Sequence, residues 1–384
     1  MFMEAKVAMT KRGFIRILGG GAVLAAGGAW AVPRLDAMPE VAVAGWTGPS
    51  NEERDVRRRA LGWAMLAPNP HNMQPWLVDL SEPDVAVLHL DRTRLLPQTD
   101  PFARQITIGH GAFLELLSIA ASAEGYRAEI APYPAGVEDG KPVARIRFTR
   151  DAALKADPLF AQIPKRRTTK IAFDGRPPSA EHLQALGAAC DMPVAFAVEP
   201  ARVEALRKLA ISGSELEMSI PRTHKESIDV VRVGSAEIAR HRDGISLTGP
   251  MMWALRRLGV MTPENAMTPG TMAFNGGRDY ALKGYASAAG FGWFSTEGNT
   301  RPTQIAAGRA YARLNLKATE LGVAMQPHSQ TLQEYPEMAA LFADMRRQTA
   351  TGEGRTLQMF FRLGYAGRTG PSPRRPLDAI VMKA

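Results

Sequence analysis

Three carboxamide side chains within six positions make the stretch from Ala67 to Trp76 the best candidate for ligand binding. Asn69, Asn72 and Gln74 lie among three prolines, which fix their own φ angles and restrict the preceding residues. A stiff loop presents amides with little entropy left to lose, and amides offer both donors and acceptors to a planar ring edge. The alternative interpretation is a polar turn between a helix and a strand.

Several other kinds of chemistry are excluded or disfavoured by the sequence. It contains no P-loop, no nucleophile-elbow serine, no zinc-protease histidine pair and no haem-attachment motif. Cys190 is the only cysteine, so neither an internal disulfide nor a multi-thiolate metal site can form. We expect Cys190 to be a small core residue, and we expect no metal.

Two motifs resemble the nitroreductase family. Pro68 to Trp76 (PNPHNMQPW) is similar to a family motif that follows the first helix, and Arg166 to Asp174 (RRTTKIAFD) is similar to the family's opening segment. In this chain the opening segment comes second, so each half of the sequence keeps one side of a site. This order resembles the Acg-type branch, which implies an α+β fold of two nitroreductase-like halves forming an internal pseudo-dimer.

The resemblance implies that FMN is the cofactor and indicates which residues bind it. Position by position, its phosphate and ribityl chain would lie on Arg166, Thr168 and Lys170, with one or both of Arg374 and Arg375 also meeting the phosphate. Arginine suits a phosphate because it donates charge-assisted hydrogen bonds in parallel. From the other half Asn69, Asn72 and Gln74 would reach the cofactor; Asn69 stands where the family usually has serine. A solvated tail pair is the alternative for the two C-terminal arginines.

A third stretch, Gly322 to Ser329, matches the family segment whose backbone runs near the flavin N5 atom. Ser329 replaces the acidic residue that often follows the proline, which puts access of a nicotinamide in question. His328 is the best candidate for a proton donor because histidine titrates near neutral pH. The alternative is a simple turn residue.

Periodic patterns predict the elements that position these residues. Ser50 and Glu53 fit a capping box opening a helix to about Ala67, and 76–80 and 85–90 read as strands, followed by a late strand at 356–363. The segments 111–125 and 308–322 are helical and share terminal glycines at an offset of 197 residues. This repeat predicts two related halves.

The predicted organisation is therefore a first half at 50–150 and a second half at 151–384, with an insertion at about 210–300 that acts as a lid or partner surface. We predict a linker at residues 32–49, because residues 33–49 show no periodicity. Arg309, Arg313 and Lys317 recur at helical spacing and form either a solvated stripe or a surface facing an anion.

Residues 1–31 resemble a twin-arginine signal, with Lys11 in place of the first arginine and an apolar run too short for a membrane span. We therefore expect a periplasmic or otherwise exported protein, or else a cytoplasmic one if the signal is not used. The net charge of +9 is scattered and accompanies no nucleic-acid-binding motif, so we expect no nucleic-acid partner.

The sequence thus predicts an FMN-dependent oxidoreductase of nitroreductase type. It would reduce a small planar electron acceptor, a nitroaromatic or a quinone, in ping-pong fashion, with NAD(P)H, a quinol or a redox protein as donor. The alternative is a flavin-binding or storage protein whose lid closes the site and which does not turn over. We expect a monomeric pseudo-dimer or a homodimer, without a stable membrane span.

Overall fold

The computed structural model describes residues 35–383, so the predicted signal at 1–31 lies outside the described residues. The first half forms an antiparallel sheet of order β1-β2-β4-β3 with two helices. Its elements are α3 (Val56–Ala64), β1 (Trp76–Asp79), β2 (Val85–Leu90), α4 (Arg104–Ala123), β3 (Tyr126–Pro132) and β4 (Ala144–Arg150).

The second half repeats this arrangement with the antiparallel order β5-β8-β10-β9. Its elements are α5 (Ala180–Gly187), β5 (Ala195–Ala197), β8 (Gly290–Glu297), α12 (Arg301–Glu320), β9 (Ala324–Pro327) and β10 (Arg355–Gly364), with α13 (Ala339–Gln348) before the last strand. Helix–strand order and sheet order are therefore the same in both halves, as the sequence repeat predicts.

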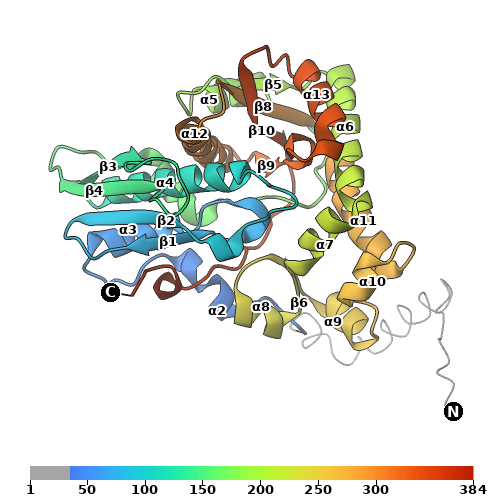
Figure 1. Cartoon of the computed structure of the whole chain (residues 1–384), viewed down its shortest axis with the longest axis horizontal. Helices are drawn as coiled ribbons and strands as arrows, with labels where there is room; N and C mark the ends of the chain where they lie inside the picture. The colour runs from blue at the N-terminus through green and yellow to red at the C-terminus, as the bar shows by residue number, and fades with distance from the viewer. Residues whose placement is uncertain (1–34, 384) are drawn as a thin grey trace.

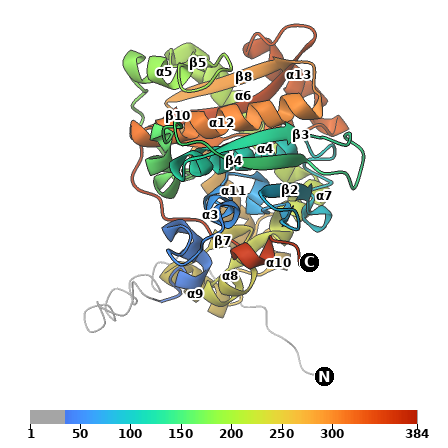
Figure 2. The ribbon, with the colours of Figure 1, turned by 90° about the vertical axis from the view of Figure 1, so that its left-hand side faces the viewer.

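The two repeated helices pack against each other at the centre of the molecule (Figures 1 and 2). α4 and α12 each have 20 residues, and Arg301 stands 197 positions after Arg104. They meet at Gly111 and Gly308: a Cβ on Gly111 would lie 2.9 Å from the Cα of Gly308 and closer still to the carbonyl of Ile305. Side chains of both helices share one hydrophobic core, so the halves are joined through it.

The insertion lies between β5 and β8 and runs from about residue 200 to residue 286, ten residues earlier than predicted at its start. It contains α6 (Pro200–Ser219), α7 (Pro221–Asp229), β6 (Val231–Val233), α8 (Ser235–His241), β7 (Ile245–Leu247), α9 (Pro250–Arg257), α10 (Pro263–Met267) and α11 (Met272–Ala286). It packs back on the first half, where the Glu226 carboxylate accepts the backbone N–H groups of Gln98 and Thr99 at 2.8 Å.

Two sequence predictions are wrong in the first half. The helix begins at Val56, capped by Asp55, which accepts the Arg57 N–H at 2.8 Å, and not at Ser50. The structureless reading of 33–49 also fails, because α2 (Glu40–Val43) and η2 (Ala44–Thr47) form there. The first error is local, because Asp55 provides the cap in place of Ser50. The second arises because the segment of α2 and η2 packs on distant parts of the chain, where the Arg374 N–H donates to the carbonyl of Ala42, and local periodicity does not encode such contacts.

The C-terminal segment crosses to the first half after β10. The Val78 N–H donates to the carbonyl of Ile380 and the Met382 N–H donates to the carbonyl of Val78, both at 2.8 Å. The short helix η8 (Leu377–Ala379) directly precedes Ile380. Figure 1 shows this return as the dark red segment that reaches the blue elements. It brings Arg374 and Arg375 beside the loop that follows α3, where Arg374 donates to Asn72 and the Arg375 N–H donates to Gln74. The first half, predicted to end at residue 150, therefore also makes contacts with the C-terminal segment of the chain.

One helix of the described chain, α4, is long and apolar enough to be a candidate membrane span by length and composition. Most of it is covered by the rest of the protein, since 83% of the apolar window is buried. A buried core helix gives the same composition, and α4 is a core helix here.

Candidate functional site

The loop between α3 and β1 has an unusual backbone. His71, Asn72 and Gln74 all have positive φ angles, of 46°, 56° and 52°, which non-glycine residues seldom adopt. The Asn69 side chain holds the loop by accepting the Gln74 N–H at 2.7 Å, and Gly109 of α4 leaves room for Asn69. Strained positions of this kind cluster at ligand-binding sites and persist where surrounding contacts over-determine them.

In this structure the three predicted amides bind protein groups. Asn72 donates to the carbonyl of Pro373 at 3.0 Å and accepts from Arg374 at 2.6 Å. Gln74 is fully buried, accepts the Arg375 N–H at 2.8 Å and donates to the carbonyl of Arg242 at 2.9 Å. The amides thus connect the loop to the C-terminal segment and to the insertion, which lie far away in sequence.

Three arginines gather directly behind this loop. The side chains of Arg166 and Arg374, only 1% and 3% exposed, both donate to the carbonyl of Leu66, at 2.8 and 3.0 Å. Arg167 is half-buried next to them. The structure therefore brings together the predicted residues Arg166 and Arg374, from the second half and the C-terminal return, at the end of the first-half helix α3.

This arginine cluster, defined as Arg166, Arg167 and Arg374, lacks a counter-charge. Within residues 35–383 none of the three forms an ion pair with a carboxylate, and the Nε–H group of each is buried without a hydrogen-bond partner. Buried donors and charges are normally paired, because leaving them unpaired is costly. Three adjacent exceptions indicate a site built for an anion.

Trp46 covers the cluster. No sequence pattern pointed to this residue, because it lies in the segment that we predicted to be a linker. Its ring centroid is 5.5, 4.2 and 5.1 Å from the guanidinium carbons of Arg166, Arg167 and Arg374. These are cation–π distances.

Burial disfavours the charged form of these arginines and lowers their pKa values. Desolvation lowers the pKa of Arg166 to about 10, and it lowers the pKa of Arg374 well below its usual value, with the charges of Arg166 and Arg167 acting in the same direction. Arg166 is still cationic at neutral pH. An anion bound among these groups would offset both the desolvation and the mutual repulsion.

Lys170 and His71 extend the site toward the second half. The Lys170 side chain is solvent-accessible, and desolvation by the surrounding protein lowers its pKa. Burial, and then the charge of Lys170, lower the pKa of His71 to about 4, so His71 is neutral at neutral pH. Thr168 is half-buried on the chain between Arg166 and Lys170. His71 was not among the predicted site residues.

Arg362 of β10, also missed by the sequence analysis, fixes the backbone of this segment. Its Nη2 donates to the carbonyls of Thr169 and Lys170 at 3.1 Å and to that of Ile171 at 2.8 Å. Its Nε donates to Gln326 at 2.7 Å. Arg362 is thus saturated by neutral acceptors and positions Lys170 instead of binding a ligand itself.

His328 does not have the properties of the predicted proton donor. Its side chain is fully buried, with its ring centroid 4.6 Å from that of Tyr285, and burial together with Arg362 lowers its pKa to about 3. A neutral imidazole at neutral pH cannot act as the cationic acid that the prediction assumed. Ser329 follows it, half-buried, at the start of η6 (Gln330–Leu332).

Arg375 belongs to a different environment from Arg374. Its guanidinium lies 3.5 Å from Asp91 and donates to the carbonyl of Ala379 at 2.7 Å. Of the two C-terminal arginines, only Arg374 enters the cluster without a carboxylate.

The corresponding place in the other half has arginines that are paired. Arg313 of α12 donates to the carbonyl of Ala189, which stands two residues past α5 as Leu66 stands two past α3. Glu115 pairs with Arg309 at 2.7 Å and with Arg313 at 2.9 Å, and Asp157 pairs with Arg313 at 2.8 Å. The predicted arginine stripe of α12 therefore meets carboxylates of its own chain.

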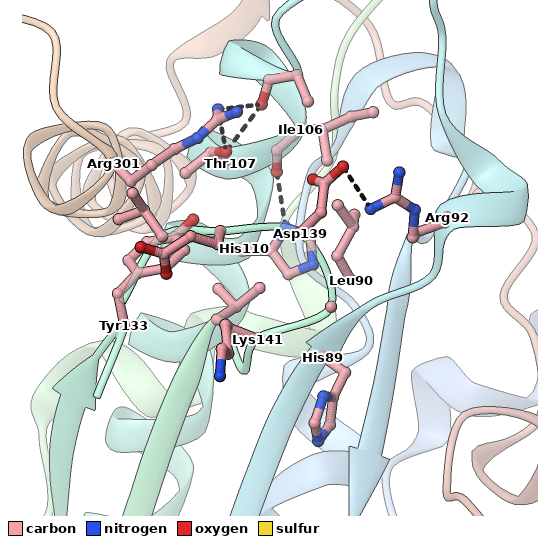
Figure 3. A pocket seen from close by; sticks show the side chains of 15 residues that line it. His89, Leu90, Arg92, Ile106, Thr107, His110, Tyr133, Asp139, Lys141 and Arg301 are labelled. Carbon is pink, nitrogen blue, oxygen red and sulfur yellow. Dashed lines mark hydrogen bonds and ion pairs between the residues drawn. The ribbon is translucent and has the colours of Figure 1, made fainter. Parts of the chain in front are cut away.

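Two hollows lie near these elements. One, of about 470 Å³, lies between η2, α3 and the C-terminal segment and is lined by Arg374 and Arg375. The other, of about 80 Å³, lies at the start of α4, where Arg301 donates to Thr107 at 3.0 Å and the Arg92–Asp139 pair lies at its edge (Figure 3). The second contains none of the predicted site residues.

Among the described residues no group of His, Cys, Asp or Glu has the arrangement of a metal site.

Sequence comparison relates the chain to nitroreductases. It is 33% identical over 125 residues to "Putative NAD(P)H nitroreductase acg" of Mycobacterium tuberculosis, a match covering 31% of this chain and about a third of that protein's length, 36%. It is 26% identical over 348 residues to an uncharacterized protein of the same species, covering 84% of this chain and 92% of that one. A second "Putative NAD(P)H nitroreductase" of this species is 24% identical, covering 86% and 92%. These similarities support a relationship with the nitroreductase family.

No family model matches the chain. Among solved structures, the FMN and NADPH-dependent nitroreductase NfnB from sphigopyxis sp. strain HMH is 18% identical with a TM-score of 0.36, covering 59% of this chain and 99% of that one. A nitroreductase with bound FMN from Desulfitobacterium hafniense is 16% identical with a TM-score of 0.34, covering 59% and 99%. At these TM-scores the likeness does not define the fold of this chain.

Proposed function

We propose that this chain is an FMN-dependent oxidoreductase of the nitroreductase type, with one FMN held between two nitroreductase-like halves. The observation that carries the proposal is the arginine cluster: within residues 35–383, its three adjacent guanidiniums have buried Nε–H groups without a partner and no paired carboxylate. A phosphate monoester dianion fits such a donor set, because each guanidinium can donate charge-assisted hydrogen bonds to its oxygens. The relationship to nitroreductases supports FMN as the molecule that carries this phosphate.

The remaining predicted residues extend from that anchor. Arg166, Arg167 and Arg374 would hold the phosphate, Thr168 the ribityl chain, and Lys170 with the segment at Ser329 the ring. Asn69, Asn72 and Gln74 already bind protein groups, so we assign them to shaping the loop, and we assign Arg375 to the Asp91 network. His328 is fully buried and neutral at neutral pH, so the proposal gives it no role in proton transfer.

Bound FMN would supply the hydride and electron chemistry, while the protein binds and orients it. We propose a nitroaromatic or quinone-like acceptor, alternating with a donor in ping-pong fashion. The donor would be NAD(P)H, or a quinol or redox protein if the chain is exported through the twin-arginine route. The insertion would act as a lid.

The absorbance spectrum of the purified full chain tests the proposal. We expect a flavin band that a reductant such as dithionite or NADPH bleaches and that a nitroaromatic or a quinone restores. A colourless protein that also fails to take up added FMN would contradict it. A flavin that stays oxidised with every reductant would instead support a flavin-binding or storage protein.

A pair of substitutions locates the cofactor. Arg166→Met should weaken FMN binding by at least about 100-fold, roughly the 3 kcal/mol of a charge-assisted contact, while the protein stays folded because a costly buried charge is removed. Arg313→Met in the paired cluster is the matched control: it should keep the flavin but lower the melting temperature, since it deprives Glu115 and Asp157 of a partner. Full FMN occupancy in Arg166→Met would refute the assignment.

A further inference from the structure

The segment that carries Trp46 is tied down at both ends, although its sequence has no periodic pattern. The Trp46 indole N–H donates to the carbonyl of Ser372 at 2.7 Å, and the Arg374 N–H donates to the carbonyl of Ala42 at 2.8 Å. Further back, the Asp36 side chain accepts the Ser235 N–H of the insertion at 2.6 Å. The segment 36–47, which we call the strap, therefore joins the C-terminal return to the insertion across the arginine cluster.

The ring of Trp46 lies within cation–π distance of all three guanidiniums of the cluster. Three like charges within one cluster repel each other, and in the described chain no carboxylate offsets them. The negative face of an indole attracts guanidinium groups and excludes water from them. The Nη groups of these arginines already donate to protein acceptors, whereas their Nε–H groups have no partner among the described residues. Because attraction through a ring face does not use an in-plane Nε–H, the ring and an oxyanion can act on the same arginines together.

We propose that Trp46 is the retaining residue of this anion site: it holds the three guanidiniums in place under the strap and slows the release of a bound phosphate monoester. This inference rests on the proposed function for the identity of that ester as FMN. It assigns the strap, and not only the arginines, to cofactor binding, and it makes Trp46 a positioning residue that does not itself need to touch the cofactor.

The experiment compares Trp46→Ala and Trp46→Phe with a matched control in the other half. Trp293 is also buried, also lies over an arginine, with a centroid distance of 5.5 Å to Arg202, and also donates its indole N–H to a carbonyl, that of Thr349 at 3.0 Å. Trp293→Ala should therefore cost comparable stability without touching the anion site.

The first measurement is the release of FMN from the loaded full chain, followed by the recovery of free-flavin fluorescence. We expect release about ten-fold faster in Trp46→Ala, as the loss of cation–π contacts implies, and within about three-fold of wild type in Trp46→Phe, which keeps an aromatic face. Trp293→Ala should release FMN at the wild-type rate. Release from Trp46→Ala at the wild-type rate overturns the inference and leaves the proposed function standing.

The second measurement does not depend on flavin. Inorganic phosphate should raise the melting temperature of flavin-free wild-type and Trp293→Ala protein relative to chloride at equal ionic strength, and it should fail to do so in Trp46→Ala. If Trp46→Ala does not fold, the same comparison with Trp46→Phe and Trp46→Leu decides, with protection retained only in the aromatic variant. Equal protection of all variants overturns the inference. Trp46-dependent protection in a protein that binds no FMN supports it while contradicting the proposed function.

Discussion

At the scale of single residues, the buried arginines differ in the hydrogen-bond acceptors and carboxylates that their guanidinium groups meet. Arg362 is as deeply buried as Arg166, but its donors all meet neutral acceptors: backbone carbonyls, the Gln326 amide and the Ser287 hydroxyl. Arg104 is also buried and pairs with Glu334 at 2.9 Å. Arg166 and Arg374 alone combine deep burial, an unpartnered Nε–H and a shared carbonyl. Incomplete satisfaction, not burial, therefore marks the ligand site.

Glu217 of α6 gives a prediction on pH. It is buried, accepts from Gln333 at 2.6 Å and Ser227 at 3.1 Å, and burial raises its pKa to about 7. Because the folded pKa exceeds the unfolded one, near 4.5, the native state is favoured below pH 4.5 and loses stability as pH rises to about 7. This loss should approach about 3 kcal/mol.

Urea unfolding at several pH values checks this. Glu217→Gln should remove that part of the pH dependence and be more stable than wild type at pH 8.5, because a neutral amide needs no ionisation in the core. Glu353→Gln, at an exposed glutamate before β10, is the control and should leave the slope unchanged. Parallel pH profiles for wild type and Glu217→Gln would show that Glu217 is not the group responsible.

Short motifs in the sequence pointed to Arg166 and Arg374, and the structure brings these two residues together. Sequence motifs did not point to Arg167, Trp46, His71 or Arg362. Trp46 acts through arginines more than 100 positions away, and its own segment has no periodicity. The sequence also misjudged His328, since a turn motif near a cofactor says nothing about how deeply a side chain is buried.

At the scale of elements, the repeated glycines are the feature that sequence periodicity predicted best. The repeat at an offset of 197 identified both α4 and α12, although each begins about seven residues before its predicted start. The capping box at Ser50 failed because Asp55 provides a stronger cap, whose carboxylate also binds the Arg57 guanidinium. Caps compete locally, whereas helix packing decides which segment is buried.

Gly111→Ala tests the packing of the two halves. Its Cβ would press on the backbone of α12, so we expect a net loss of about 2 kcal/mol in the free energy of unfolding despite the better helix propensity of alanine. Gly276→Ala in α11, where no atom lies within 4 Å of an added Cβ, is the control and should gain up to about 1 kcal/mol. Equal effects in a urea titration would mean that the helices do not cross at this glycine.

At the scale of the whole molecule, two halves of the same topology carry different charges at corresponding places. Next to Leu66, past α3, the arginines have no carboxylate; next to Ala189, past α5, Glu115 and Asp157 pair with Arg309 and Arg313. A fold of two similar halves presents two equivalent positions for a ligand. At the position next to Ala189, carboxylates of the chain itself already bind the arginine donors. We infer that, among the described residues, only the position next to Leu66 has arginine donors left for an anion.

This asymmetry predicts one FMN per chain. The ratio of flavin absorbance to protein, with protein measured by amino-acid analysis, should reach 1 and stay there when FMN is added in excess. The ratio should be the same whether the chain is a monomer or pairs again, because the cluster is built within one chain.

The double variant Glu115→Gln with Asp157→Asn would free the arginines of the other position. Titration calorimetry of this variant, loaded with flavin, should then show a second, weaker binding of inorganic phosphate. Two FMN per wild-type chain would show that the paired cluster does not close the second position.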